Sequence, residues 1–248
     1  MKDNYAANKL ALENVSHGYG AIQVLKNLDM EVSHGEFVVL VGPSGCGKST
    51  LLNLLSGYIK PLSGTVSVEG SIRTVYQQDG LFPWLTVTEN INIGLRHIPN
   101  KQQQQKEVDD LIGLIHLEGF ERHYPHQLSG GMRQRVELAR VLAGDFDILL
   151  MDEPFSALDY QTRLRMRKEL ILLLEKRPRT VVFVTHDIEE AAQLADRVLV
   201  LSNRPATICR ELRINAPKPR DLTDDAVVQA MKTILMELGL QTTQSTNT

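Results

Sequence analysis

The 248-residue sequence is poor in several features that would point to a specialised environment. It has two cysteines, Cys46 and Cys209, so a disulfide-stabilised secreted scaffold is not expected. No signal-peptide pattern opens the chain, which favours a reducing cytosol. No apolar run approaches the roughly 18 residues needed to cross a bilayer. If the protein acts at a membrane, other chains must cross that membrane.

The chain carries only a small net charge. The formal net charge is −3, and this gives no support for a nucleic-acid partner. Apolar residues make up 42% of the chain and charged residues 23%, as in ordinary globular proteins. A chain of this length and composition can bury a substantial core.

Continuous apolar runs predict the core of the fold. Runs of this kind are typical of parallel strands that are covered on both faces. Between them, residues 161–176 carry apolar side chains at helical spacing. The alternation predicts a doubly wound α/β core. The expected strands are Phe37–Val41, Ile148–Met151, Val181–Val184 and Arg197–Leu201.

Two other parts differ from this core. Short strand-like segments within 10–32, at Thr65–Val68 and at Arg73–Tyr76 predict an antiparallel patch beside the main sheet. From Thr86 onward a capping-box pattern and apolar residues at three- and four-residue steps predict a helical insertion. We therefore expect one domain over 8–240. Its parts are 10–85 and 142–205 (core and antiparallel patch), 86–141 (helical subdomain), 206–240 (C-terminal helical extension) and 241–248 (polar tail).

A phosphate loop follows the first core strand. Residues 42–50 match G-x-x-x-x-G-K-S between a strand and an apolar helix, a setting that makes a chance glycine-rich turn improbable. The glycines let backbone N–H groups converge on phosphate oxygens at a positively polarised helix N-terminus. Lys48 can reach the β- and γ-phosphates, and Ser49 can ligate Mg²⁺. The expected ATP-binding residues are Gly42, Pro43, Ser44, Gly45, Cys46, Gly47, Lys48, Ser49 and Thr50; we interpret Cys46 as space-filling rather than redox-active.

Two acids and a histidine are the remaining residues that we expect to act on the bound nucleotide. Asp152 ends a buried strand, where a carboxylate can hold Mg²⁺. Glu153 is expected on the opposite side of that strand, where it can orient the attacking water or accept its proton. Alone, the two acids could equally mark a solvated strand end. His186 follows another buried strand, and it can donate a hydrogen bond to the γ-phosphate.

A second anion-binding pattern decides the class. Leu128-Ser-Gly-Gly-Met132 stands directly before a helix, so its backbone N–H groups and Ser129 hydroxyl can bind an anion. One nucleotide does not need two phosphate sites in one chain. The economical explanation is that each chain completes the site of its neighbour.

These motifs resemble an ABC transporter nucleotide-binding subunit over most of the chain, from Leu10 to Leu201. The resemblance implies a P-loop NTPase (RecA-like) core with an antiparallel β subdomain and a helical insertion. It also assigns further roles. Gln77 matches the Q-loop that serves catalysis and Mg²⁺, His186 the switch histidine, and Tyr19 the aromatic that stacks on adenine. The signature is then Ser129, Gly130 and Gly131 with their flanking residues, Leu149–Glu153 is the Walker B strand, and Ser156–Asp159 is the D-loop.

By this resemblance, two ATPase subunits sandwich two ATP molecules, each between one chain's phosphate loop and the other's signature. The partner is an identical or homologous chain. Leu81–Leu85 lies where family members grip integral membrane permease subunits, although a core-packed loop is the alternative. The expected location is peripheral, on the cytoplasmic face of the inner (plasma) membrane. A substrate-binding protein is then an indirect partner.

Within the family, the chain is similar to the nitrate/sulfonate/taurine import branch. The residues that carry this similarity are Pro83–Val87, Tyr124–Met132 and Ser202–Pro205, although Ala206 stands where the branch commonly has glycine. Cargoes of the branch include nitrate, sulfonates, taurine, bicarbonate and thiamine-precursor pyrimidines. The ATPase chain does not touch cargo, so its sequence does not choose among them.

Three other functions are compatible with parts of the sequence. A small-molecule kinase shares the phosphate loop but lacks the signature and the Asp152–Glu153 pair. A non-transport ABC ATPase for assembly or repair would be separated by its failure to co-purify with membrane chains. A non-hydrolysing scaffold would not need Glu153 and His186, both of which are present.

Overall fold

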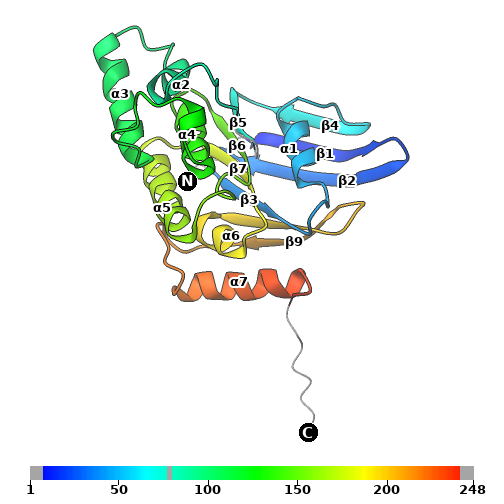
Figure 1. Cartoon of the computed structure of the whole chain (residues 1–248). Helices are drawn as coiled ribbons and strands as arrows, with labels where there is room; N and C mark the ends of the chain where they lie inside the picture. The colour runs from blue at the N-terminus through cyan, green and yellow to red at the C-terminus, as the bar shows by residue number, and fades with distance from the viewer. Residues whose placement is uncertain (1–7, 77–79, 241–248) are drawn as a thin grey trace, which may run out of the picture. The chain divides into compact units, whose positions relative to one another are not determined.

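The computed structural model describes residues 8–76 and 80–240. The chain divides into two compact units, each of which is described by itself (Figure 1). The first unit holds residues up to Glu69 and from Thr180 onward, and the second holds Gly70–Arg179. In the described ranges no helix is both long and apolar enough to span a bilayer.

Three parallel strands form the centre of the first unit. They are β3 (Phe37–Val41), β7 (Thr180–Val184) and β8 (Arg197–Leu201), and all fifteen residues are buried. β3 pairs with β7 on one side and with β8 on the other. Complete burial explains why these runs are continuous rather than alternating. The helices α1 (Lys48–Leu55) and α6 (Ile188–Leu194) follow β3 and β7.

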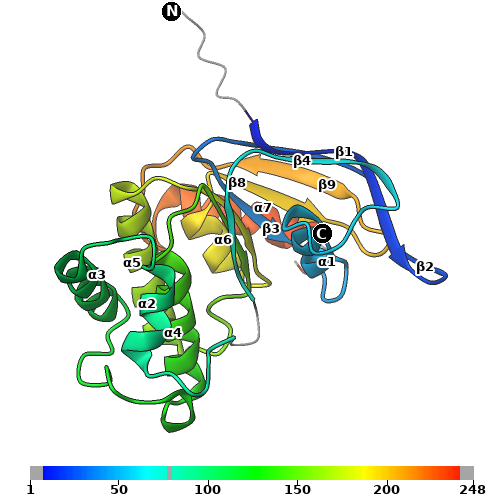
Figure 2. The same cartoon turned by 90° about the horizontal axis from the view of Figure 1, so that it is seen from above.

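The C-terminal part of this unit contains a strand that we did not expect. β9 (Ile208–Arg213) pairs antiparallel with β8, and only then comes α7 (Asp225–Glu237), which lies beside α6 (Figures 1 and 2). The segment 206–240, expected to be helical, is therefore strand and helix. In β9 charged residues do not alternate regularly with apolar ones, as is common on an edge strand. The sequence of this segment therefore lacks the alternating pattern from which a strand is predicted.

The predicted antiparallel patch is confirmed as a three-stranded sheet. Its order is β2 (Ile22–Ser33), β1 (Asn8–Tyr19), β4 (Ser63–Val68). The hairpin between β1 and β2 depends on glycine. A methyl group at Gly18 would lie 2.4 Å from the carbonyl oxygen of Ile22. No other residue tolerates that approach.

The second unit corrects one strand assignment. We expected Arg73–Tyr76 in the antiparallel patch, but β5 (Ile72–Val75) pairs parallel with β6 (Ile148–Asp152). Four alternating residues do not specify a pairing partner. Here a side chain fixes it, because Asp147 accepts hydrogen bonds from both the backbone N–H and the hydroxyl of Ser71, at 2.9 and 3.1 Å.

Helices make up the rest of the second unit. The capping box at Thr86 is confirmed, since Thr86 N donates to Glu89 Oε2 at 2.8 Å and Glu89 N donates to Thr86 Oγ1 at 3.3 Å. α2 packs closely on α4, where a methyl group at Gly94 would lie 2.5 Å from the carbonyl oxygen of Arg140. The elements are α2 (Val87–Gly94), α3 (Lys101–Leu114), a 3₁₀ turn (Pro125–Gln127), α4 (Gly130–Leu142) and α5 (Tyr160–Lys176).

Candidate functional site

The phosphate loop (residues 42–50) connects β3 to α1 in the first unit and closes on its own lysine. Lys48 is 7% exposed, and its Nζ donates to the carbonyl oxygens of Gly42 and Pro43 at 2.8 and 3.0 Å. Cys46 N also donates to the oxygen of Pro43, at 3.2 Å. The ammonium group therefore lies inside a ring of backbone that the loop itself forms.

Glycine is required where this loop meets its surroundings. Gly47 has φ +127°, and a methyl group there would lie 2.8 Å from Cγ1 of Val24. At Gly42 a methyl group would lie 3.0 Å from both Sγ of Cys46 and Cβ of Leu201. Cys46 itself is 2% exposed, which agrees with a space-filling role. The loop is thus packed from outside against Val24 and Leu201.

The N-terminus of α1 is suited to an anion. Gly47 occupies the N-cap position, no side chain caps the helix, and its first turn has no acidic residue. The first N–H groups of a helix need partners from outside it, and a phosphate can provide them. Ser44, Gly45 and Ser49 are exposed at this end, and Thr50 is partly exposed. Ser49 therefore offers an accessible hydroxyl in the first turn.

His186 lies in the same unit, exposed between β7 and α6. The turn around it is firmly built. The Asp187 carboxylate caps α6, accepting from the N–H groups of Glu189 and Glu190 at 2.9 and 3.3 Å. Thr185 Oγ1 donates to Glu190 Oε2 at 2.5 Å. These contacts hold the backbone on both sides of the imidazole.

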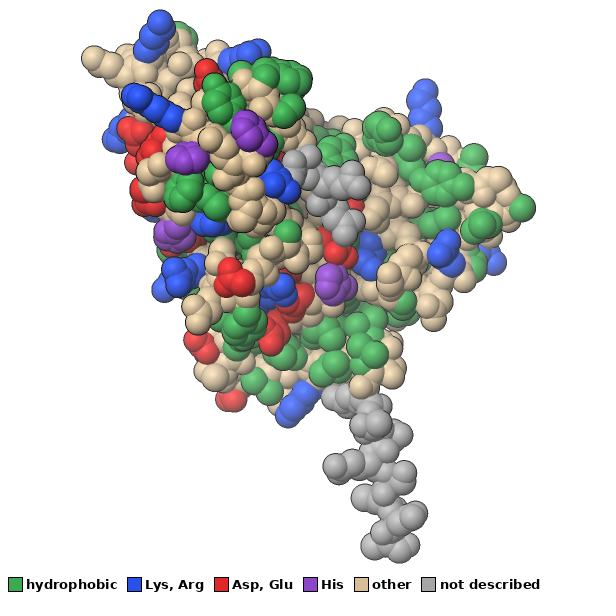
Figure 3. Space-filling model, viewed as in Figure 1, with side chains coloured by type: hydrophobic (Ala, Val, Ile, Leu, Met, Phe, Trp, Pro, Cys, Tyr) green, Lys and Arg blue, Asp and Glu red, His purple; other side chains and the backbone are tan. Residues whose placement is uncertain are grey.

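Tyr19 lies at the end of β1 and is 53% exposed. Its ring meets the buried ring of His17 edge to face, with centroids 5.0 Å apart and planes at 83°. Hydrophobic side chains reach the surface over this three-stranded sheet (Figure 3). An exposed aromatic ring that is supported from beneath is a suitable stacking surface.

The two acids belong to the second unit. Asp152 is the last residue of β6 and is 9% exposed. Glu153 lies beyond the strand, with φ +48°. The alternation of side chains along the strand therefore ends before Glu153, and our expectation that it faces the opposite side of the strand from Asp152 stays a prediction. A left-handed backbone is uncommon for a residue with a side chain, and it is often found at functional sites.

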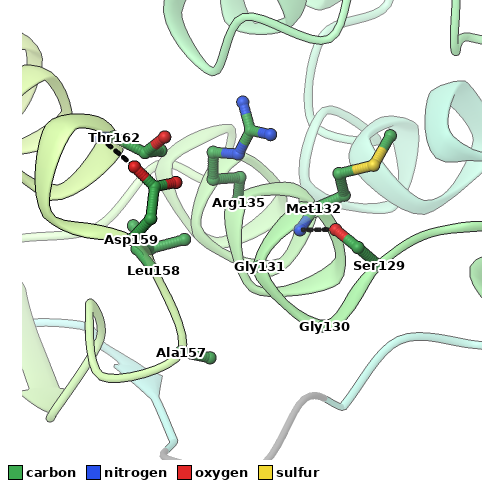
Figure 4. A pocket seen from close by; sticks show the side chains of 9 residues that line it. All are labelled: Ser129, Gly130, Gly131, Met132, Arg135, Ala157, Leu158, Asp159 and Thr162. Atoms are coloured by element: carbon green, nitrogen blue, oxygen red, sulfur yellow. Dashed lines mark hydrogen bonds between the residues drawn. The ribbon is translucent and has the colours of Figure 1, made fainter.

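The signature and the D-loop line one pocket of about 390 Å³ in this unit (Figure 4). Ser129 caps α4, since its Oγ accepts from Met132 N at 3.2 Å. Asp159 caps α5 in the same manner, accepting from Thr162 N at 3.0 Å. We call this the signature pocket; it is lined by Ser129, Gly130, Gly131, Met132, Arg135, Ala157, Leu158, Asp159 and Thr162.

Two opposite charges face this pocket. Hydrogen bonds from the side chain and backbone of Thr162 lower the pKa of Asp159, which therefore stays ionised. Burial lowers the pKa of Arg135, an effect that the charge of Asp159 opposes. Arg135 Nη1 donates to the carbonyl oxygens of Ile115 and His116 at 2.6 and 3.1 Å. Arg135 thus joins the signature helix to the end of α3.

The sequence did not reveal Gln134, which links the signature helix to the acids. It is 6% exposed. Its Nε2 donates to the carbonyl oxygen of Glu153 at 3.4 Å, and its Oε1 accepts from Ala157 N at 3.1 Å. One amide thus connects α4, Glu153 and the D-loop. A glutamine on a polar-looking helix gives no signal of such a role.

The segment Leu81–Leu85 combines a fixed backbone with exposed rings. Leu81 is buried, whereas Trp84 is 68% exposed. Asn90, fully buried and also missed from the sequence, donates to the carbonyl oxygens of Phe82 and Leu85 at 3.2 and 3.0 Å. Arg140 lies over the ring of Phe82, 5.5 Å from its centroid. An anchored backbone with an exposed tryptophan suits a docking surface better than a core-packed loop.

A metal role rests on oxygen donors. Mg²⁺ in nucleotide sites typically takes one or two protein oxygens together with phosphate oxygens. Asp152 offers a buried carboxylate in the second unit, and Ser49 offers an exposed hydroxyl in the first; each is an oxygen donor of this kind. Among the described residues, no group of three or more His, Cys, Asp and Glu side chains could hold a metal ion. Gln77, the other expected ligand, lies outside the described residues.

Comparison with known proteins decides the family. The family model described as ABC transporter matches residues 25–156. The chain belongs to the ABC transporter family. It is an ATP-binding cassette, an ATPase of that family, as the motifs predicted. The likeness to a solved ABC transporter cassette and the observed sheets confirm the P-loop NTPase fold with its antiparallel subdomain.

Individual relatives agree with this assignment. An uncharacterised ABC transporter ATP-binding protein of Methanocaldococcus jannaschii is 42% identical over 241 residues, 92% of this chain and 90% of the relative. The nitrate import ATP-binding protein NrtD of Synechocystis sp. is 47% identical, covering 80% of this chain and 78% of the relative. The aliphatic sulfonates import ATP-binding protein SsuB of Bacillus cereus is 39% identical, covering 87% and 88%.

Solved structures give the same result. An ABC transporter cassette solved as a dimer superimposes with a TM-score of 0.75 and 35% identity, covering 84% of this chain and all of the other. A cassette in a post-hydrolysis state, bound to ADP and Pi, has a TM-score of 0.74 and 34% identity, with the same coverage. Both cassettes are described as dimeric.

Proposed function

We propose that this chain hydrolyses ATP as one of a pair and thereby drives import of a small oxyanion through separate membrane subunits. One observation carries the proposal. The chain builds two different phosphate-type sites, a closed loop around Lys48 and an open pocket at Ser129. A single bound nucleotide needs only the first, so the second serves a nucleotide on another copy.

In this proposal the phosphate loop binds the ATP phosphates through its backbone N–H groups and Lys48. Tyr19 stacks on adenine. Asp152, Ser49 and Gln77 hold Mg²⁺, which when bound neutralises part of the phosphate charge. The built geometry that supports these roles is the uncapped start of α1, the buried Asp152 carboxylate and the supported ring of Tyr19.

The proposed reaction is attack of water on the γ-phosphorus. A bond forms between the water oxygen and phosphorus, and the bond from phosphorus to the β–γ bridging oxygen breaks, giving ADP and phosphate. Glu153 orients the water and accepts its proton, while His186 donates a hydrogen bond to a γ-phosphate oxygen. Gln134 fixes the backbone at Glu153, and the Asp187 cap fixes the backbone that follows His186.

The second copy completes each site. Ser129, Gly130 and Gly131 of one chain bind the γ-phosphate held by the other, at the N-terminus of α4. Asp159 in the D-loop lines the same pocket and contributes to the shared interface. The dimeric cassettes that this chain resembles support the proposal.

In this proposal the segment Leu81–Leu85 contacts the membrane subunits. Under the same proposal, Trp84 inserts into a membrane subunit, and the chain is a peripheral subunit on the cytoplasmic face of the plasma membrane. An exposed aromatic side chain on a rigid backbone loses little conformational entropy on binding. A substrate-binding protein outside the membrane would deliver cargo. Relatives named for nitrate and aliphatic sulfonates support an oxyanion cargo.

The test is reconstitution with the membrane subunits. We would co-express the cassette with candidate permease chains, purify the complex, and measure ATP-dependent uptake of nitrate, an alkanesulfonate, taurine and bicarbonate into liposomes. Uptake of one of these anions is the expected result. Trp84→Ala should abolish uptake while nucleotide affinity stays unchanged, and Tyr58→Ala removes an even more exposed ring (77% exposed) from the first unit as a control.

Two results would contradict the proposal. A cassette that hydrolyses ATP but co-purifies with no membrane chain would indicate a non-transport ABC ATPase. Full uptake by Trp84→Ala would remove the docking role from Leu81–Leu85 and leave the ATPase assignment intact.

A further inference from the structure

The loop between β8 and β9 contains a motif whose role the proposed function leaves open. Residues Ser202–Pro205 marked the import branch in the sequence, without a chemical reason. In the structure this loop is tightly closed. Ser202 N donates to the carbonyl oxygen of Thr207 at 3.0 Å, and Thr207 N donates back to Ser202 Oγ at 3.0 Å. A closed loop of this kind can hold a side chain in a defined place.

The same loop is fastened to the residues that flank the phosphate loop. Ala206 N donates to the carbonyl oxygen of Val24 at 2.7 Å, and Lys26 N donates to the oxygen of Ala206 at 3.1 Å. Val24 is the residue that a methyl group at Gly47 would meet. At the other end of the loop, Leu201 contacts the position of a methyl group at Gly42. The two loops of the first unit are therefore held together at both ends.

Arg204 lies at the centre of this arrangement. A methyl group at Gly45 would be 3.1 Å from Nη2 of Arg204 and 4.0 Å from its Cζ. The guanidinium group therefore lies directly against the exposed part of the phosphate loop. Gly45 has φ +71° and no side chain, which leaves room for this approach. Among the residues that the structure describes, no carboxylate forms an ion pair with Arg204.

A second cation near the phosphate loop would help to balance the negative charge of a bound nucleotide. Lys48 is buried and already donates to two carbonyl oxygens of the loop. A nucleoside triphosphate carries several negative charges, and one ammonium with one helix N-terminus balances only part of them. A guanidinium group is always protonated and can donate two parallel hydrogen bonds to a phosphate.

We propose that Arg204 is a second phosphate-binding cation of this nucleotide site, held over Gly45 by the β8–β9 loop. The proposal rests on the proposed function, because it assumes that the phosphate loop binds ATP. It gives the Ser202–Pro205 motif a chemical role. The motif closes the loop, and its arginine adds positive charge beside Gly45.

The experiment measures binding of three probes to the full-length protein by calorimetry: ATP, inorganic tripolyphosphate and adenosine. Arg204→Ala should weaken both phosphate probes about tenfold, as expected for a lost charge-assisted hydrogen bond, and leave adenosine unchanged. Arg204→Lys should retain part of the affinity, since it keeps the charge. Arg213→Ala, which removes an exposed arginine from β9, is the matched control and should bind as the wild type does.

Two results would overturn the inference. Equal affinities for Arg204→Ala, Arg213→Ala and the wild type would show that the guanidinium does not act on phosphate. A similar loss for adenosine would show a purely structural role. If Arg204→Ala does not fold, Arg204→Gln removes the charge while keeping more of the side chain, and it gives the same comparison. Wild-type protein that binds no ATP would overturn the proposed function as well, whereas wild-type binding with unaffected Arg204 variants overturns only this inference.

Discussion

The phosphate loop and the signature pocket both present the N-terminus of a helix to an anion, but they differ in the groups around that N-terminus. At α1 no side chain caps the helix, and a buried lysine stands inside the loop. At α4 the hydroxyl of Ser129 already accepts from a backbone N–H. The signature pocket contains no lysine, and its arginine donates elsewhere. From these differences we expect the first site to bind phosphate strongly by itself and the second site to bind it weakly.

This difference explains why the pocket suits a shared role. A weak anion site adds little binding energy by itself, so it contributes only when another molecule already holds the phosphate in place. A strong second site would bind a nucleotide independently of the partner and would uncouple pairing from ATP. Mutations in the two sites can separate nucleotide binding by the phosphate loop from completion of the partner's site by the signature pocket.

The largest expected effect comes from Lys48→Ala. Removing the ammonium takes away the only cation inside the loop and also two hydrogen bonds to loop carbonyls. We expect ATP hydrolysis to fall about 100-fold or more, and ATP affinity to fall with it. A coupled phosphate-release assay and calorimetry measure both.

Lys26→Ala is the matched control, since it removes an exposed lysine from β2. It should hydrolyse ATP as the wild type does. If Lys48→Ala kept wild-type ATP affinity, the loop would not be the strong site, and the comparison above would fail.

A smaller effect is expected from Gly131→Ala in the signature pocket. The added methyl group would lie 3.2 Å from the carbonyl oxygen of Ala157 and from Cδ2 of Leu158, so the D-loop must shift by a few tenths of an ångström. Hydrolysis should fall about tenfold, while ATP affinity of the isolated chain stays unchanged. Gly113→Ala, which adds a methyl group to α3 at an uncrowded position, should keep full activity. Parallel loss of affinity in Gly131→Ala would mean that the pocket is not separate from the loop.

The smallest expected effect is the change with pH in the stability that Asp159 contributes. Hydrogen bonds from Thr162 lower the folded-state pKa of this carboxylate, so its contribution to stability is complete above the unfolded-state pKa, about 3.9. The contribution is lost as the pH falls through the lowered folded-state value. Asp159→Asn keeps a capping side chain that does not titrate. Melting temperatures of the two proteins should differ slightly at neutral pH and converge in acid; a constant difference would contradict the assignment.

Much of the core was predictable because burial leaves a direct mark on sequence. Phe37–Val41 and Val181–Val184 had to be continuous apolar runs, since both faces of those strands are covered. The phosphate loop was equally readable, because its chemistry depends on backbone geometry that only glycine at fixed spacing allows. The capping box at Thr86 was visible for the same local reason.

What the sequence did not reveal depends on contacts between distant residues. The partner of β5 is fixed by Asp147 and Ser71, which are far apart in the chain. Gln134 and Asn90 act by bonding to backbone groups of other segments, and an isolated amide gives no sign of that. Arg204 is a surface arginine until the fold brings it to Gly45.

The most direct test of the central claim is the mass of Glu153→Gln protein in solution, with and without ATP and Mg²⁺. This change should keep nucleotide binding and nearly abolish turnover, so ATP should remain between paired copies. The account predicts a monomer without nucleotide and a doubled mass with ATP, and the doubling should be lost when Gly131→Ala is added. A mass that stays at one chain at high protein and ATP concentration would contradict the claim that the signature pocket completes the site of a second copy.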